Sequence, residues 1–185
     1  AIQLSRNMVG ILLFLIIAVA VFNVVSTLFL IVKDKEGDIA ILRLLSDTTN
    51  EIAEGEVEQL TRAGDPQTTT AQYMQVIRKK TAVLFAAAAQ GAALLAGADA
   101  ATEQALRTFG LNLGIAFQMI DDVLDYEGDP ATMGKNVGDD LTEGKTTLPL
   151  IHAMREGTAA ERDLVRNAIG ARNAAKIVDV MAAVQ

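Results

Sequence analysis

The sequence contains no cysteine, no tryptophan and only three prolines in 185 residues. The absence of cysteine excludes disulfide bonds and thiol chemistry, and it leaves the cellular compartment open. Few prolines and few aromatic residues, together with abundant alanine, leucine and glutamate, favour helices over strands. The sequence shows neither an alternating strand pattern nor an internal repeat. It therefore predicts an all-α protein.

Positive charge is scarce and unevenly distributed. The formal net charge is −7, which argues against a nucleic-acid partner because such partners usually need a basic face. Residues 1–45 contain four Lys or Arg against three Asp or Glu, a net charge of +1. Residues 46–185 contain twelve against twenty, a net charge of −8. The chain therefore divides into two unlike parts.

The first part contains a long uncharged segment, residues 9–32. Roughly 24 residues in a helix span about 36 Å, enough to cross ~30 Å of hydrocarbon. A secretory signal peptide is one alternative, but its apolar core is shorter and a small-residue cleavage site should follow, whereas residues 33–36 read Lys-Asp-Lys-Glu. A buried core helix is the other alternative. We expect a retained membrane-spanning helix.

Basic residues flank this segment unequally. Arg6 precedes it, whereas Lys33, Lys35 and Arg43 follow it. The positive-inside rule therefore predicts an inner or cytoplasmic membrane location with the C-terminal part in the cytoplasm.

The first part also contains three recognisable stretches: Ser-Arg-Asn-Met at 5–8, Phe-Asn-Val-Val-Ser-Thr at 22–27, and Val-Lys-Asp-Lys-Glu-Gly-Asp-Ile-Ala-Ile-Leu-Arg at 32–43. Together they resemble the lipoprotein-releasing ABC transporter permeases. The resemblance implies a transmembrane helix that continues into a cytoplasmic segment contacting an ATPase subunit. It ends near Arg43, and a plain membrane anchor accounts for the same residues. Residues 1–43 are thus interpreted as a permease-like membrane helix with its cytoplasmic flank.

The second part reads as a series of helices. The pattern predicts helices near residues 69–96 and 100–126, and a capping-box pair, Thr158 with Glu161, begins another. The alanine-rich stretch 81–98 is apolar enough to suggest a second span. Because alanine contributes little to membrane insertion, we expect a buried bundle helix there instead.

An acidic motif follows in the predicted helix 100–126. Asp121 and Asp125 are four residues apart and share a helix face with Gln118, whereas Asp122 lies about 100° around the helix. Like charges at this spacing repel each other, and a divalent cation would relieve that repulsion. Magnesium prefers oxygen ligands and commonly takes one or two carboxylates together with substrate phosphates. The alternative is a solvated acidic helix end.

Basic residues accompany the acidic motif on both sides. Lys79 and Lys80 precede it, and Lys135 and Lys145 follow it, each of the last two after a glycine. Ammonium groups near such a motif suit a diphosphate bridged by metal ions. The ordered set resembles the polyprenyl diphosphate synthases (octaprenyl type) of the all-helical isoprenoid synthase fold, over about residues 44–185: Gly-Glu at 55–56, Lys-Thr at 80–81, FQMIDDVLD at 117–125, GKNVGDDL at 134–141 and EGKTTLPLIHAM at 143–154.

The resemblance implies transfer of an allylic prenyl group to isopentenyl diphosphate with Mg²⁺ as cofactor. It makes Asp121 the main magnesium ligand, with Asp122 and Asp125 helping directly or through water. It places Lys80, Lys135 and Lys145 on the diphosphate, and Thr81 and Gln118 near the allylic end. The implied roles are therefore catalytic for Lys80, Thr81 and Gln118, diphosphate binding for Lys80, Lys135 and Lys145, and metal binding for Asp121, Asp122 and Asp125.

Other polar candidates carry less weight. Asp139, Asp140 and Glu143 form a second acidic cluster, which we interpret as the N-terminal acidic turn of a helix. His152, the single histidine, lies in an apolar helix and is interpreted as a core residue.

The resemblance is incomplete, because the family's first Asp-rich motif has no counterpart upstream of Gly55. We therefore expect the central part of a synthase domain, truncated at both ends, that does not catalyse elongation alone. Uncovered apolar faces suggest self-association, with a homodimer as one outcome. Two alternatives stay open. One is a membrane-anchored, permease-like fragment whose soluble part only binds a ligand. The other is a chimera, joined near Leu44, with no function of its own.

Overall fold

The computed structural model describes residues 2–127, 138–172 and 177–184. Within these ranges every regular element is helical and no strand occurs, which confirms the predicted all-α class. Internal contacts separate the chain into two units, residues 1–43 and residues 44–185. The two units are described separately below.

The first unit is the N-terminal part of helix α1 (Ile2–Thr61). Its segment Ile16–Lys33 is long and apolar enough to cross a membrane, and none of it is buried within the structure. One such helix near an N-terminus is weak evidence for a membrane span, because a signal sequence or the core helix of a soluble protein also meets these criteria. No other described helix meets the same length and composition criteria.

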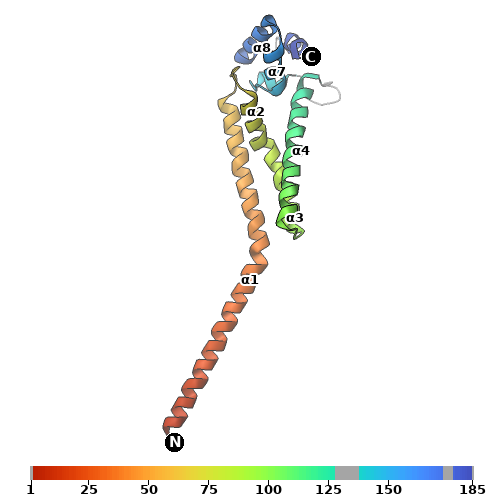
Figure 1. Cartoon of the computed structure of the whole chain (residues 1–185). Coiled ribbons are helices and arrows are strands. Elements are labelled where there is room, and N and C mark those ends of the chain that lie inside the picture. The colour runs from red at the N-terminus through yellow and green to blue at the C-terminus, as the bar shows by residue number, and fades with distance from the viewer. Residues whose placement is uncertain (1, 128–137, 173–176, 185) are drawn as a thin grey trace. The chain divides into compact units, whose positions relative to one another are not determined.

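The second unit begins with the end of α1 and continues into a helical hairpin. One arm of the hairpin runs through α2 (Thr70–Ile77), the π-helical turn η1 (Arg78–Ala82) and α3 (Val83–Leu95). The other arm is α4 (Ala100–Glu127), which packs along α3 and η1. Figure 1 shows the two arms side by side.

Small residues allow these helices to approach closely. A Cβ atom at Gly114 of α4 would lie 2.6 Å from the Cα atom of Ala82, and one at Gly55 of α1 would lie 2.7 Å from the backbone nitrogen of Lys80. Ala82 and Ala86 are buried on the opposing surface. Any larger side chain at either glycine would push the backbones apart, so the helix spacing depends on the missing Cβ atoms.

The rest of the second unit forms a cap at one end of the hairpin (Figure 1). It contains α6 (Asp139–Thr142), α7 (Leu148–Glu156), α8 (Ala159–Ala171) and α9 (Ile177–Val184). The predicted Thr158–Glu161 capping box begins α8, with both reciprocal bonds present. The core of the cap joins the end of α4 to these helices and contains Tyr126, Leu141, Leu150, Ala153, Val165, Ala168, Ile169 and Val180.

Candidate functional site

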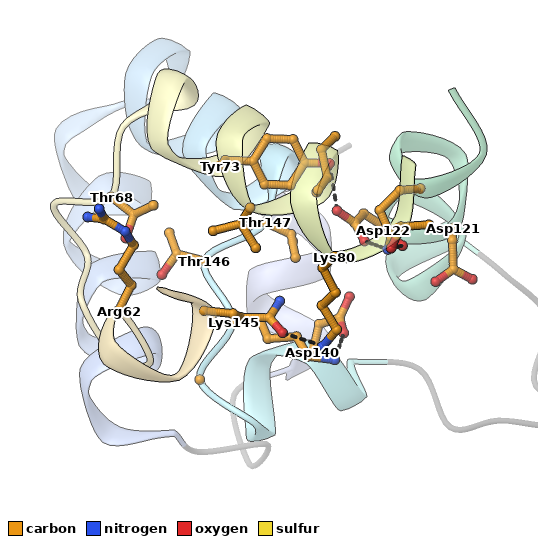
Figure 2. Close-up of a pocket in the computed structure, with 16 residues that line it drawn as sticks. Arg62, Thr68, Tyr73, Lys80, Asp121, Asp122, Asp140, Lys145, Thr146 and Thr147 are labelled. Carbon is orange, nitrogen blue, oxygen red and sulfur yellow. Dashed lines mark hydrogen bonds and ion pairs between the residues drawn. The ribbon is translucent and has the colours of Figure 1, made fainter. Parts of the chain in front are cut away.

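A cavity of about 240 Å³ opens where the hairpin meets the cap, and Figure 2 shows its lining. Its wall combines the end of α1, α2, η1, α4, α6 and the loop before α7. Six of the eight predicted site residues line it: Lys80, Thr81, Gln118, Asp121, Asp122 and Lys145. Asp125 does not line it, and Lys135 lies outside the described residues. One cavity therefore brings together most of the residues suggested by the sequence.

The π-helical turn determines which lysine faces the cavity. In η1 the backbone N–H of Val83 donates to the carbonyl of Arg78, five residues earlier, so the turn is wider than an α-helical one. Lys79 pairs with Glu58 at 2.7 Å and with Glu54 at 3.3 Å. Its neighbour Lys80 lines the cavity instead. Such π-turns are frequent at functional sites because they redirect side chains within a helix.

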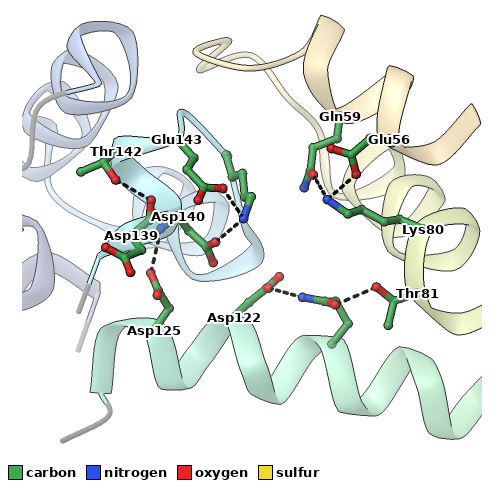
Figure 3. A network of polar contacts seen from close by, with 12 residues as sticks. Glu56, Gln59, Lys80, Thr81, Asp122, Asp125, Asp139, Asp140, Thr142 and Glu143 are labelled. Carbon is green, nitrogen blue, oxygen red and sulfur yellow. Dashed lines mark hydrogen bonds and ion pairs between the residues drawn. The ribbon is translucent and has the colours of Figure 1, made fainter. Parts of the chain in front are cut away.

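Lys80 is held by two acceptors at the end of α1. Its Nζ lies 2.6 Å from Glu56 Oε2 and 2.6 Å from Gln59 Oε1, as Figure 3 shows. The close approach of Gly55 to the Lys80 backbone brings the two helices within this range. The ammonium group is thus positioned at the cavity edge by a carboxylate that an anionic ligand could replace.

A chain of hydrogen bonds crosses the α4 wall of the cavity. The Tyr73 hydroxyl donates to Asp122 Oδ2 at 2.7 Å, and Gln118 Nε2 donates to Asp122 Oδ1 at 2.8 Å. The Thr81 hydroxyl donates to Gln118 Oε1 at 2.8 Å (Figure 3). The Asp122 side chain is therefore bound at both oxygens by protein donors.

Burial changes the acidity of two groups in this chain. Burial raises the pKa of Asp122 to about 6, although its bonds from Tyr73 and Gln118 act in the opposite direction. Burial also raises the pKa of Tyr73, and the neighbouring Asp122 charge adds to that rise. Tyr73 therefore stays protonated and serves as a donor.

Asp125 has a different environment from its two neighbours in the motif. It is 1% exposed, and its Oδ2 accepts a bond of 3.2 Å from the backbone N–H of Asp140. Its carbonyl accepts another, of 2.9 Å, from the N–H of Gly138. Gly138 is the N-cap residue of α6 and has no side chain with which to cap it, so Asp125 supplies acceptors for the first turn of α6 from a neighbouring helix.

The second acidic cluster, after the motif, contributes a cavity residue that the sequence analysis missed. Asp139 and Asp140 occupy the first turn of α6, as the acidic-turn interpretation predicted. Asp140 also lines the cavity, and its Oδ1 lies 2.9 Å from Lys145 Nζ. Glu143 binds the same ammonium at 2.6 Å. Burial lowers the pKa of Lys145, but these two carboxylates outweigh it and the net pKa is raised.

Further lining residues were also missed: Gln59, Arg62, Thr68, Tyr73, Val76, Ile77, Gly144, Thr146 and Thr147. Tyr73 had a detectable signal, because it lies seven residues before Lys80 and so on nearly the same helix face. Arg62 and Thr68 had none, since they come from the turn after α1. His152, interpreted as a core residue, is exposed on α7 beside Arg155, so that interpretation was wrong.

The described residues contain no group of three or more His, Cys, Asp or Glu side chains arranged to hold a metal ion. Asp121 and Asp140 nevertheless line the same cavity as Lys80 and Lys145. Magnesium usually keeps several waters and binds one or two carboxylates together with substrate phosphates. The residues therefore fit a magnesium ion that arrives with a phosphate ligand rather than a permanent protein cage.

A helical hairpin and cap around a cavity lined by acidic and basic side chains define the class of the all-helical isoprenoid synthases. A solved polyprenyl synthase from Caulobacter crescentus, complexed with calcium and isoprenyl diphosphate, shares this fold with a TM-score of 0.75 and 45% identity. The match covers 78% of this chain and 45% of that one. The heptaprenyl diphosphate synthase of Staphylococcus aureus gives a TM-score of 0.72 at 27% identity, over 78% of this chain and 45% of that one.

The chain belongs to the polyprenyl synthetase family, whose model matches residues 7–185. It is 51% identical over 144 residues to the octaprenyl diphosphate synthase of Haemophilus influenzae, covering 78% of this chain and 44% of that protein. It is 49% identical over 143 residues to the enzyme of the same name from Escherichia coli, covering 77% and 44%. The chain thus spans less than half the length of these relatives.

These comparisons confirm the synthase part of the sequence interpretation. The permease resemblance of residues 1–43 stays a prediction, and the family match extends into that segment as far as residue 7. The domain boundaries and the individual site roles also stay predictions.

Proposed function

We propose that residues 44–185 bind an allylic diphosphate in this cavity and form part of a site for prenyl transfer to isopentenyl diphosphate. The observation that carries the proposal is the shared lining: Asp121 and Asp122 of α4 lie on the same cavity as Lys80 and Lys145. A diphosphate needs cationic donors for its oxygens, and a bridging metal ion needs a carboxylate.

Each side chain has a role that follows from its position. Lys80 and Lys145 exchange their present carboxylate partners for diphosphate oxygens. Asp121, at the cavity face of α4, is the first candidate to hold Mg²⁺, with Asp122 and Asp125 supporting it. A bound magnesium ion supplies Lewis-acid stabilisation of the charge that develops on the departing diphosphate. Thr81 and Gln118 direct oxygen atoms toward the allylic carbon as its bond to oxygen breaks.

We also propose that this chain alone binds without completing elongation. Its sequence lacks the first Asp-rich motif, and it spans 44% of the octaprenyl diphosphate synthases it resembles. The transfer forms a carbon–carbon bond between the allylic carbon and isopentenyl diphosphate, breaks the allylic carbon–oxygen bond and releases a proton. A second diphosphate must therefore be held, and Arg62 is the remaining cation on this cavity besides Lys80 and Lys145 among the described lining residues.

Calorimetric binding of farnesyl diphosphate to the full chain in detergent, with and without MgCl₂, tests the proposal. We expect magnesium-dependent binding that Asp121→Ala weakens at least tenfold. The matched control is Asp163→Ala, which removes an exposed carboxylate from α8, away from the cavity. Equal losses in both variants, or unchanged binding in Asp121→Ala, would contradict the assignment.

Incorporation of labelled isopentenyl diphosphate onto farnesyl diphosphate tests the second statement. We expect no product from the folded chain. Product above an Asp121→Ala control would show that the chain, alone or as a homodimer, supplies the missing half of the site.

For residues 9–32 we propose anchoring in the inner or cytoplasmic membrane with residues 44–185 in the cytoplasm. The support is the uncharged segment and the basic residues that follow it. Resistance to carbonate extraction, together with protease access from the cytoplasmic side only, tests this placement. The chimera alternative has its own test: a natural transcript read continuously across codons 40–50 would rule it out.

A further inference from the structure

The hydrogen-bond chain on the α4 wall begins at a residue to which no role has been assigned, Tyr73. Tyr73 belongs to α2, Thr81 to η1, and Gln118 and Asp122 to α4, so the chain joins three elements. Figure 2 shows the Tyr73 hydroxyl directed at the Asp122 carboxylate. Tyr73 is 5% exposed and Asp122 is 3% exposed, so water does not compete for these bonds.

The chemistry of the groups fixes the direction of every bond in the chain. A carboxylate can only accept, so Gln118 must present its NH₂ group to Asp122. The amide oxygen of Gln118 then points the other way and accepts from the Thr81 hydroxyl. With its proton used in this bond, the Thr81 oxygen directs its lone pairs at the cavity that Thr81 lines. Lone pairs suit a ligand carbon that gains positive charge.

The adjacent carboxylates Asp121 and Asp122 therefore have different surroundings. Both oxygens of Asp122 are occupied by Tyr73 and Gln118, and turning this carboxylate toward a cation would break the chain. Asp121 lines the same cavity one residue earlier and is partly exposed. The Tyr73 and Gln118 bonds fix the orientation of the Asp122 carboxylate.

We propose that Tyr73 is a positioning residue of this cavity: its hydroxyl locks the Asp122 carboxylate against the Gln118 amide, which turns the Thr81 oxygen toward the ligand. The inference rests on the proposed function for its ligand, but the lock itself exists without one. Removing the hydroxyl leaves Asp122 bound by Gln118 alone and free to rotate toward the cavity.

The lock is tested by the side-chain NH₂ signal of Gln118, followed by ¹⁵N NMR on the full chain in detergent micelles. We expect Tyr73→Phe to speed hydrogen exchange of this group at least fivefold and to shift its resonance. The internal control is Gln90 on α3, whose NH₂ donates to Glu103 at 2.7 Å and should not change. Loss of fold would change both amides, whereas loss of the lock changes only Gln118. An unchanged Gln118 signal would overturn the proposal.

Tyr126→Phe is the matched control variant. Tyr126 is also buried, and its hydroxyl lies near enough to Thr147 to influence its pKa, but it makes no hydrogen bond of good geometry to any described residue. The same oxygen is removed, so Gln118 should keep its wild-type exchange rate. An equal response to both variants would assign the effect to packing and defeat the proposal.

A second variant keeps the test decisive if Tyr73→Phe does not fold. Asp122→Leu keeps a side chain of similar size but removes both acceptors, so the Gln118 NH₂ group loses its partner. The Gln118 NH₂ signal should then move while that of Gln90 stays. If Gln118 stays as well, Asp122 does not orient it and the lock is refuted.

The functional consequence is measured separately, with magnesium pyrophosphate as the probe in a calorimeter. We expect Tyr73→Phe to weaken its binding about fivefold and Tyr126→Phe to leave it unchanged. If the wild-type chain binds no magnesium pyrophosphate, the proposed function is wrong. The NMR result still shows whether Tyr73 holds Asp122 against Gln118. If Tyr73→Phe releases Gln118 yet binds the probe like the wild type, the positioning role is overturned.

Discussion

The two faces of helix α4 differ in how closely the other described helices pack against them. On one face Gly110, Gly114 and Asp122 are buried against α2, η1 and α3. On the other, large apolar side chains stay exposed: Leu106, Phe109, Leu113, Phe117, Ile120 and Leu124, with Phe109 at 63% and Ile120 at 60%. The buried face is built from small and polar groups and the exposed face from large apolar ones, the reverse of an ordinary surface helix.

The contrast shows that the composition of a helix face does not decide whether it is buried. Close approach to Ala82 requires glycine, and the cavity requires carboxylates, so the buried face carries little apolar area. The exposed stripe has the 3–4 spacing of a helix-packing seam, and Phe117 makes a tilted ring contact with Phe85, with the centroids 5.3 Å apart. Asp121 lies at the border between the two faces.

The largest change in the free energy of unfolding is expected from a substitution on the buried face. Gly114→Ala adds one methyl group that would lie 2.6 Å from the Ala82 Cα atom, so we expect a loss of about 2 kcal/mol in the free energy of unfolding. Gly91→Ala in α3 makes the same chemical change with only an ordinary contact of 3.8 Å to Leu44, and should stabilise by about 0.5–1 kcal/mol. Denaturant unfolding followed by circular dichroism measures both. If both substitutions changed the free energy of unfolding in the same direction, helix propensity rather than the distance between the helices would be the dominant cause.

An effect of similar size concerns the carboxylate on the buried face. The folded-state pKa of Asp122 is raised to about 6 from an ordinary value of 3.8, so the folded state binds more protons between these pH values. Its contribution to stability is therefore present below about pH 4 and is lost as pH rises through about 6. Asp122→Asn should remove this loss, on the order of 2 kcal/mol. The test compares the free energies of unfolding of the wild type and Asp122→Asn in metal-free buffer at pH 4 and pH 7. If the wild type gained stability relative to Asp122→Asn between pH 4 and pH 7, the predicted sign would be wrong.

The smallest effect on stability belongs to the exposed face. Ile120→Ser should change the free energy of unfolding by no more than about 0.5 kcal/mol, because its side chain is exposed. The same change should weaken self-association, since it interrupts the apolar stripe. Leu95→Ser is the control: Leu95 is 77% exposed but lies at the end of α3. Sedimentation in detergent should distinguish the two variants, and equal behaviour would remove the stripe as the association surface.

Much of this arrangement could be predicted from the sequence, because it depends on local patterns. The capping box at Thr158 and the helix carrying Asp121 follow from residue spacing, and the synthase interpretation follows from the order of the motifs. The choice between Lys79 and Lys80 rested on resemblance alone. The π-turn that separates the two lysines packs against Gly55, and this contact joins segments 25 residues apart in the chain.

Two other features were beyond sequence reasoning for similar reasons. Spacing places Asp125 on the same helix face as Asp121, but the position of α6 draws its carboxylate into a backbone bond instead. Asp140 lines the cavity from the first turn of α6, where its Oδ1 lies 2.9 Å from Lys145 Nζ. Both outcomes depend on where a separate element lies, which local periodicity does not encode.

The bond from the Asp140 amide to Asp125 gives the chain a built-in reporter of its own opening. The Gly138 and Asp140 amide protons are both bound to Asp125, one to its carbonyl and one to its carboxylate. They can exchange with solvent only when the end of α4 separates from α6. In a hydrogen-exchange experiment these two amides should therefore give the same opening free energy once their intrinsic exchange rates are divided out, and that value measures the opening of the wall that carries Asp140.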